Sequence, residues 1–211
     1  MSRPGDPRRP GTLLAVMAHP DDAELWAGGT IALHAEAAQA TIAIPPAEPA
    51  RLAEATAGAD TLGAHLHILD AHPIAEAISA LIARLRPEIV VTHPATDVHP
   101  HHRGVAEAVL AAVPDAVIST GFPRRLYSCD SYNSLTLAGP VPAATIIDIT
   151  TTYSTKMRAL AAHSVTQPIN DHFGPMADTL ARLWGARIGT QYAELFTPIP
   201  LLGRLPGATQ L

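Results

Sequence analysis

Residues 16–30 read VMAHPDDAELWAGGT, and this stretch sets the pattern that the rest of the chain follows. The apolar run TLLAVMA at 12–18 predicts a buried strand, and it ends abruptly in His19, Pro20, Asp21 and Asp22. A helix-like pattern follows at 28–39. Two adjacent carboxylates beside a histidine repel each other and are costly to bury, so we expect a positive group among them.

The same alternation of short apolar runs and amphipathic stretches continues along the chain. Strands are predicted at 12–18, 40–45, 65–70 and 88–93, and helices at 28–39, 48–63, 74–86 and 101–113. After residue 114 the rhythm weakens, with strands expected at 125–130 and 144–149 and helices at 151–164 and 176–189. Such alternation predicts βαβ units and a parallel sheet.

The expected fold is therefore α/β: a Rossmann-like, doubly wound, mostly parallel sheet with helices on both faces and a modified C-terminal third. We expect one domain over 1–211, with 1–10 as a flexible leader. The pair Gly28–Gly29 lacks the glycine-rich dinucleotide pattern and predicts close packing of a helix on the sheet. Trp26 and Trp184 are expected in the core or in a groove.

Composition excludes several classes of function. Of the 211 residues 47% are apolar, the formal net charge is −5 and there is no long basic run, which argues against a nucleic-acid partner. No stretch approaches the ~20 apolar residues of a membrane helix, so we expect a cytoplasmic protein without membrane insertion. Cys129 is the only cysteine, which rules out an internal disulfide and predicts a structural role. The sequence is compatible with a monomer or with a homo-oligomer.

Two polar clusters fall at the ends of predicted strands, where ligands collect in open α/β sheets. One is His19-Pro-Asp21-Asp22, and the other is THPATDVHPHHRG at 92–104. Strands one and four are neighbours in the commonest strand order, so the clusters are expected to meet. Two imidazoles and one carboxylate would then form a three-ligand metal site with an open position for water. The second aspartate would be free to accept a proton.

Each cluster also has a simpler interpretation. An Asp pair before a helix is commonly an N-cap, and a lone histidine at a strand end is commonly exposed. A His-rich turn is not specific by itself, although His99 and His102 at i, i+3 share one side of a helix start. Their joint occurrence at adjacent strand ends favours the metal site.

AHPDDAE followed by GGT resembles the signature of the PIG-L/LmbE-like zinc-dependent N-deacetylases. VTHPATDVHPHHRGV resembles the second signature of that family, and KMRALAAHSVTQ (156–167) and QYAELF (191–196) are similar to later motifs. The resemblance implies a Rossmann-like fold and removal of an N-acetyl group from an amino sugar or an aminoglycoside-like intermediate. Specialised metabolism, such as antibiotic biosynthesis, is the expected setting.

The resemblance also implies roles for individual residues, with Zn²⁺ as the metal and Fe²⁺ or another divalent ion as the alternative. His19, Asp22 and His102 would bind the metal, Asp21 would be the general base, and His99 would steady the oxyanion. Arg51 would contact the substrate, and Glu24 would lie behind the ligands.

The chain departs from the family pattern at two places. His101 stands where the family has an aspartate, and we expect it beside the ligands in a supporting position. The loop after the second strand is short, which predicts a more open pocket. Asp130, Tyr132 and Asn133, in YSCDSYNSL (127–135), are candidate partners for sugar hydroxyls.

Two rival functions remain. A non-haem iron enzyme also uses two histidines and one carboxylate, although that chemistry is typical of antiparallel jelly-roll sheets. The third hypothesis is a sugar-binding homologue whose catalysis is weakened by His101 or by the short loop.

Overall fold

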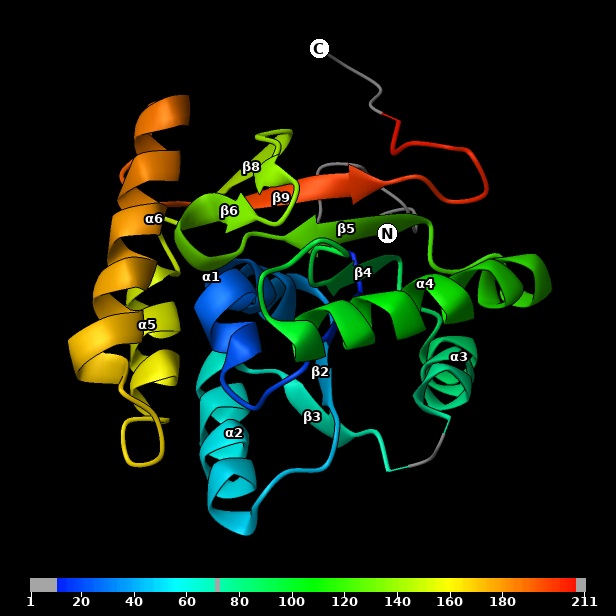
Figure 1. The fold of residues 1–211 in the computed structure, drawn as a ribbon, viewed down its shortest axis with the longest axis horizontal. Helices are drawn as coiled ribbons and strands as arrows, with labels where there is room; N and C mark the ends of the chain where they lie inside the picture. The colour runs from blue at the N-terminus through cyan, green and yellow to red at the C-terminus, as the bar shows by residue number, and fades with distance from the viewer. Residues whose placement is uncertain (1–10, 71–72, 208–211) are drawn as a thin grey trace.

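A computed structural model describes residues 11–70 and 73–207, and Figure 1 shows its ribbon. The predicted leader at 1–10 lies outside the described residues. The strands are β1 Leu13–Val16, β2 Ala40–Ile44, β3 His65–Ile68, β4 Ile89–Thr92, β5 Arg125–Cys129, β6 Leu135–Thr136, β7 Gly139–Pro140, β8 Thr145–Asp148 and β9 Ala193–Ile199. The α-helices are α1 Asp22–Ala37, α2 Pro49–Leu62, α3 Ile74–Leu85, α4 Pro100–Thr120, α5 Tyr153–Ala161 and α6 Gly174–Ile188. Two shorter helical turns are η1 Tyr132–Ser134 and η2 Ile169–Phe173.

In the described part of the chain, seven strands form one sheet in the order β3-β2-β1-β4-β5-β9-β8. The first five of these are parallel to one another. β1 lies between β2 and β4, and Leu14 of β1 is in register with Val90 of β4. This reversal of strand order at β1 and β4 is the place where ligands bind in such sheets. The predicted doubly wound α/β fold is confirmed.

Helices cover both faces of the sheet, as predicted. α3 and α4 pack together on one face, over a core that includes Leu14, Ile82 and Val109. α1, α2, α5 and α6 share the other face, over a core that includes Ile31 and Leu160. No helix within 11–70 and 73–207 is long and apolar enough to cross a membrane.

The main differences from the predictions concern α1, α4 and β9. α1 begins at Asp22, six residues before the predicted start, so the second aspartate of the motif belongs to its first turn. α4 runs through Pro114 to Thr120 instead of stopping at 113. β9 was not predicted as a strand, and its second residue is the carboxylate Glu194.

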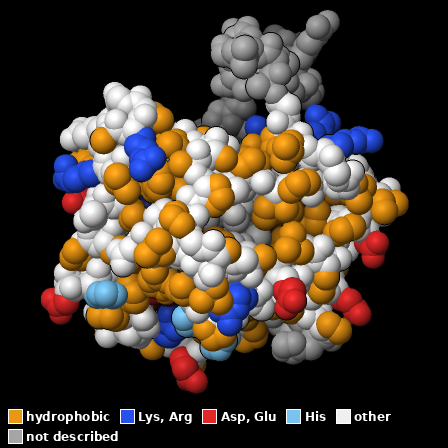
Figure 2. Space-filling view, turned by 45° about the horizontal axis from the view of Figure 1, so that its top comes forward, with side chains coloured by type: hydrophobic (Ala, Val, Ile, Leu, Met, Phe, Trp, Pro, Cys, Tyr) orange, Lys and Arg blue, Asp and Glu red, His pale blue; other side chains and the backbone are white. Residues whose placement is uncertain are grey.

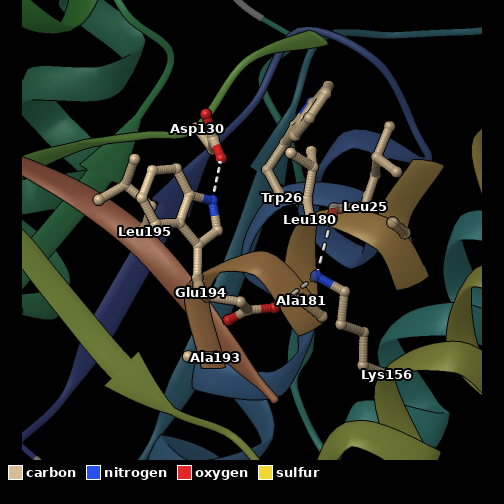
Figure 3. Close-up of a pocket in the computed structure, with 11 residues that line it drawn as sticks. Leu25, Trp26, Asp130, Lys156, Leu180, Ala181, Ala193, Glu194 and Leu195 are labelled. Carbon is tan, nitrogen blue, oxygen red and sulfur yellow. Dashed lines mark hydrogen bonds and ion pairs between the residues drawn. The ribbon is translucent and has the colours of Figure 1, made fainter. Parts of the chain in front are cut away.

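β9 lies antiparallel between β5 and β8, and it modifies the C-terminal third of the fold. Its Glu194 is buried and accepts hydrogen bonds from the backbone N–H groups of Gly29 and Thr30 in α1. Lys156 of α5 donates to Glu194 at 2.6 Å and to the carbonyl of Leu25 at 2.9 Å (Figure 3). A buried ion pair thus ties α1 to the C-terminal third.

The pair Gly28–Gly29 allows this close approach to α1. A Cβ atom on Gly29 would lie 2.7 Å from the Cβ atom of Ile149, just beyond β8, and one on Gly28 would lie 3.1 Å from Lys156 Cγ. The predicted close packing is therefore observed, with Ile149 and Lys156 as the neighbours.

We predict that Gly29→Ala destabilises the protein, because its methyl group overlaps Ile149. Overpacking of this kind costs about 1–3 kcal/mol. Urea unfolding followed by circular dichroism measures the change. Gly104→Ala in α4 is the matched control, since nothing lies within 4 Å of its Cβ position, and helix propensity should then make it neutral or stabilising. Equal effects of the two substitutions would contradict the packing argument.

Candidate metal centre

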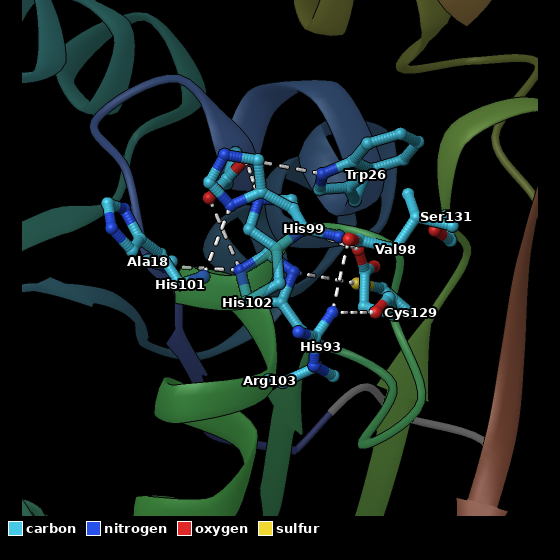
Figure 4. Close-up of polar contacts among 12 residues, drawn as sticks. Ala18, Trp26, His93, Val98, His99, His101, His102, Arg103, Cys129 and Ser131 are labelled. Atoms are coloured by element: carbon cyan, nitrogen blue, oxygen red, sulfur yellow. Dashed lines mark hydrogen bonds and ion pairs between the residues drawn. The ribbon is translucent and has the colours of Figure 1, made fainter. Parts of the chain in front are cut away.

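The two polar clusters of the sequence meet at the carboxyl ends of β1 and β4. His19 and Asp22 come from the turn after β1 and the start of α1, and His99 and His102 come from the start of α4 (Figure 4). His19 and His102 are 83 positions apart in the chain, yet His19 Nδ1 lies 3.2 Å from His102 Nε2. The parallel pairing of β1 with β4 brings them together.

The three predicted ligands converge on one point. His19 Nδ1 is 3.1 Å from Asp22 Oδ2, and His102 Nε2 is 3.3 Å from Asp22 Oδ1. Each imidazole nitrogen thus faces a different oxygen of the Asp22 carboxylate, and the two nitrogens are 3.2 Å apart, so the three side chains form a triangle. Tetrahedral zinc with bonds of about 2.05 Å has ligand–ligand edges of about 3.3 Å. The donor set and its spacing therefore fit a divalent metal.

Two overlapping sets of side chains also have ligand atoms within 4.8 Å of one another. They are His19, His99 and His102, and Asp22, His93 and His102. The second set is poorly suited to one ion, because the rings of His93 and His102 are stacked at 3.8 Å and 13°. Imidazole lone pairs lie in the ring plane, so parallel stacked rings do not direct both at the same point.

The sequence interpretation assigned no role to Asp97 or His93, although both lie in the quoted 92–104 stretch. Asp97 is fully buried, and its Oδ1 lies 3.2 Å from His102 Nδ1, on the side of the ring that faces away from the other ligands. A carboxylate at this position fixes the tautomer and the ring plane of a metal-binding histidine. A carboxylate five residues before a proposed ligand is the signal that would have found it.

His93 fills the space beneath His102. Its Nε2 accepts a hydrogen bond from the backbone N–H of Ala18 at 3.0 Å, and its Nδ1 is 4.0 Å from Cys129 Sγ (Figure 4). Cys129 is fully buried, and burial raises the pKa of its thiol well above the usual range. Both side chains therefore pack beneath the cluster.

His101 contacts the other side of His19. Its Nδ1 lies 3.2 Å from His19 Nε2, and its side chain is exposed. His101 thus contacts a proposed ligand with an imidazole, where the family pattern has a carboxylate.

The electrostatics of the cluster centre on Asp22, which is 2% exposed. Burial opposes its ionisation, but His93, His102 and His19 outweigh burial and hold the pKa of Asp22 well below its usual range. For His102 the opposing effect of burial is likewise overcome, here by hydrogen bonds to Asp22 and Asp97, which raise its pKa to about 9. In the absence of a metal, His102 is therefore the positive group that the sequence required.

Asp21 lies beside the ligands and is also buried. Its Oδ1 accepts a hydrogen bond from Arg51 Nη2 at 2.7 Å, and its side chain makes no N-cap hydrogen bond. Burial and the charge of Asp22 raise the pKa of Asp21, while Arg51 opposes the shift. Asp21 thus occupies the N-cap position of α1, as the simpler interpretation expects, but without a capping hydrogen bond.

His99 caps α4, and its Nδ1 accepts the backbone N–H of His101 at 3.3 Å. Burial, followed by the nearby charge of His102, lowers the pKa of His99. A neutral His99 whose Nδ1 is an acceptor carries its proton on Nε2, which leaves that N–H free to donate.

Glu24 lies deeper, in α1. It is 1% exposed, and its Oε2 is 3.6 Å from Nε2 of His163, which is also fully buried. Burial raises the pKa of Glu24, and His163 opposes the shift. A Cβ atom on Gly58 would collide with Glu24 Oε1, so this pair is enclosed between α1, α2 and the end of α5.

The predicted sugar contacts divide into buried and exposed groups. The carboxylate of Asp130 is 4% exposed and accepts hydrogen bonds from Trp184 Nε1 at 2.7 Å and from the N–H of Ser131 (Figure 3). It therefore anchors the turn after β5, where it also lines the pocket drawn in Figure 3, and its contact with a sugar stays a prediction. Asn133 is exposed.

Tyr132, the third of these candidates, lies against the metal cluster. Its ring is parallel to that of His102, at 5.7 Å and 11°, and meets Trp26 edge-on at 5.1 Å. Trp26 Nε1 in turn donates to Asp22 Oδ1 at 3.3 Å. Burial, then the charges of Asp22, Asp21 and Asp97, raise the pKa of Tyr132, so its hydroxyl stays protonated.

The surface near the cluster mixes polar and apolar side chains. Val98, next to His99, is 41% exposed, and Leu137, whose N–H donates to the carbonyl of Thr96, is 69% exposed. On the face shown in Figure 2, histidine side chains reach the surface among hydrophobic ones, with charged groups beside them.

Comparisons with known proteins support the fold. No protein-family model and no curated protein matches the sequence. The structure is similar to that of the 4-carboxy-2-hydroxymuconate hydratase GalB from Pseudomonas putida, with a TM-score of 0.78, 20% identity and coverage of 95% of this chain and 99% of that one.

Solved deacetylases are also among the similar structures. The N,N'-diacetylchitobiose deacetylase from Pyrococcus horikoshii has a TM-score of 0.72 and 18% identity, covering 90% of this chain and 84% of its own. The A40926 pseudoaglycone deacetylase Dbv21 has a TM-score of 0.68 and 23% identity, covering 90% and 97%.

We predict that His102→Ala abolishes binding of one equivalent of zinc, because it removes a corner of the ligand triangle. Asp97→Asn keeps the ligand but weakens its support, so a loss of about 10- to 100-fold in affinity is expected. Competition with a chromophoric chelator measures both. His65→Ala on β3 is the control, since His65 is exposed on another strand. Retention of full metal content by His102→Ala would refute the assignment.

The raised pKa of His102 gives a pH dependence with a definite sign. Below about pH 9 the metal-free protein holds a proton on His102, and this proton must leave before the nitrogen binds a metal. Apparent zinc affinity should therefore rise about tenfold per pH unit between pH 6.5 and 9. Proton release measured by calorimetry in two buffers of different ionisation enthalpy checks this. A pH-independent affinity would contradict it.

Proposed function

We propose that this chain is a PIG-L/LmbE-like, metal-dependent N-deacetylase that removes the acetyl group of an amino sugar or a related glycoside. The observation that carries the proposal is the triangle of His19, Asp22 and His102, with the buried carboxylate of Asp21 directly beside it. The similar structures of two deacetylases, one for a chitobiose and one for an antibiotic pseudoaglycone, support it. A cytoplasmic location and a role in antibiotic biosynthesis belong to the same proposal.

Zinc is the metal we propose, because two imidazoles and one carboxylate at these spacings suit a tetrahedral ion. When bound, it supplies a Lewis acid that polarises the amide carbonyl and acidifies the attacking water. His19, Asp22 and His102 would hold it, with Asp97 and His101 fixing the two rings from behind.

In this proposal Asp21 is the general base. It takes a proton from water as the new C–O bond forms at the acetyl carbon, and it returns that proton to the amine nitrogen as the C–N bond breaks. The products are acetate and the free amine. Its raised pKa suits both transfers, and Arg51 holds the carboxylate in place at 2.7 Å.

His99 would stabilise the charge that develops on the carbonyl oxygen. Its Nδ1 accepts the N–H of His101, so its proton lies on Nε2, which has no acceptor among the described residues and can donate to a ligand. The neutral imidazole suffices as a donor. Loss of one such donor typically costs about 3 kcal/mol of transition-state stabilisation.

A hydratase is the second candidate, because the similarity to GalB extends over nearly all of both chains. A buried base and a metal cluster would also serve addition of water to an activated C=C bond. The iron-enzyme hypothesis is disfavoured. Its chemistry is typical of antiparallel jelly-roll sheets, whereas this sheet is mostly parallel with helices on both faces. The sugar-binding homologue with catalysis weakened by His101 or by the short loop is separated from the deacetylase by measuring acetate release.

The decisive experiment incubates the zinc-loaded protein with a panel of N-acetylated amino sugars and, separately, with 4-carboxy-2-hydroxymuconate. Release of equimolar acetate and free amine supports the deacetylase. Loss of the diene absorbance without acetate supports the hydratase and overturns our proposal.

We predict that Asp21→Asn lowers kcat at least a hundredfold while zinc content stays at that of the wild type, because Asp21 is beside the ligands and not among them. Asp115→Asn, on α4 and exposed, is the control and should be unchanged. Steady-state kinetics with metal analysis of each preparation measures both effects. An Asp21→Asn variant with wild-type kcat would rule out this base.

A further inference from the structure

Tyr132 forms one wall of the metal cluster, and it has no role in the reaction proposed above. Its ring is parallel to the ring of His102 at 5.7 Å, is edge-on to Trp26 at 5.1 Å, and lies 6.3 Å from Phe173. These rings come from η1, α4, α1 and η2, so four separate segments converge here. The tyrosine is only partly buried, which leaves one side open to a ligand.

The turn that carries Tyr132 is strained and firmly anchored. Asn133 and Ser134 have φ values of 51° and 58°, which are unfavourable for residues other than glycine. Asp130 secures the preceding end of the turn through Trp184 and Ser131, and Val141 N–H donates to the carbonyl of Ser134. Consecutive strained residues persist where surrounding contacts over-determine them, commonly at ligand sites.

The hydroxyl of Tyr132 makes no hydrogen bond within residues 11–70 and 73–207, although the rest of the side chain is fixed. Several neighbouring polar groups do contact one another, namely Arg51 with Asp21, His102 with Asp97, and His19 with His101. A tyrosine whose ring is fixed by packing and whose hydroxyl has no partner is suited to donate a hydrogen bond to a bound ligand.

We propose that the Tyr132 hydroxyl donates a hydrogen bond to the acetyl carbonyl oxygen of the substrate, a second donor beside His99. This inference rests on the proposed deacetylase function, because the carbonyl of the scissile amide must lie at the metal cluster. The hydrogen bond strengthens as negative charge develops on that oxygen, so Tyr132 acts mainly on kcat. Acetate, the product, offers the same kind of acceptor oxygen.

Three variants separate the hydroxyl from the ring. Tyr132→Phe keeps the contacts with His102 and Trp26 and removes only the donor. Tyr132→Leu removes both the donor and the ring. Tyr127→Phe, on β5, is the matched control, because it loses a hydroxyl that lies near Arg125 and not beside the ligands.

For Tyr132→Phe we expect kcat to fall about 10- to 100-fold with little change in KM, and with zinc affinity and the visible spectrum of the cobalt-loaded protein unchanged. Most of the loss in Tyr132→Leu should already be present in Tyr132→Phe. Tyr127→Phe should behave as the wild type. If Tyr132→Phe is fully active and only Tyr132→Leu is impaired, the ring and not the hydroxyl matters, and the proposal is overturned.

Acetate binding to the zinc-loaded proteins, followed by calorimetry, gives a second readout that does not depend on turnover. We expect acetate to bind Tyr132→Phe several-fold more weakly than it binds the wild type or Tyr127→Phe. If the wild type releases no acetate from any N-acetyl sugar, the proposed function fails, and the acetate measurement still decides whether Tyr132 is a donor. Equal acetate affinities for all three proteins would refute the inference.

Discussion

The parallel pairing of β1 with β4 is the constraint on which the candidate site depends. It places the turn after β1 next to the turn after β4, and so brings His19 and Asp22 against His102 from 80 or more positions away. The strands themselves are buried and apolar, so the hydrophobic effect stabilises the pairing. The polar residues that follow then meet at the edge of the sheet, where the repulsion between two carboxylates is offset by imidazoles on the opposite turn.

Support for that edge comes from the far end of the chain. Glu194 and Lys156 form a buried pair that binds the backbone of α1 at Gly29, Thr30 and Leu25. Because α1 begins at Asp22, this pair fixes the helix whose first turn carries a proposed metal ligand. Breaking a buried ion pair of this kind by removing one partner is costly, typically about 3–5 kcal/mol. The C-terminal third therefore serves the site without contributing a ligand to it.

The division of labour within the cluster follows from burial and hydrogen bonding. Asp22 is surrounded by imidazoles and stays ionised, whereas its neighbour Asp21 has a raised pKa and only Arg51 as a close partner. Two adjacent carboxylates thus acquire different properties, one suited to holding a cation and one to exchanging a proton. Asp97 belongs to the same arrangement, because it orients His102 from the side away from the cluster.

The alternation of apolar runs and amphipathic stretches was enough to predict the α/β fold, the adjacency of strands one and four, and the meeting of the two polar motifs, because period and turn residues are local properties. Only the tertiary structure decided that Asp97 and His93 contact His102. It also decided that the carboxylate of Asp130 accepts a hydrogen bond from Trp184, and that β9 lies between β5 and β8 in the sheet. The physical reason is that these outcomes depend on which side chains burial brings together, and a carboxylate in a strand or turn carries no local sign of its distant partner.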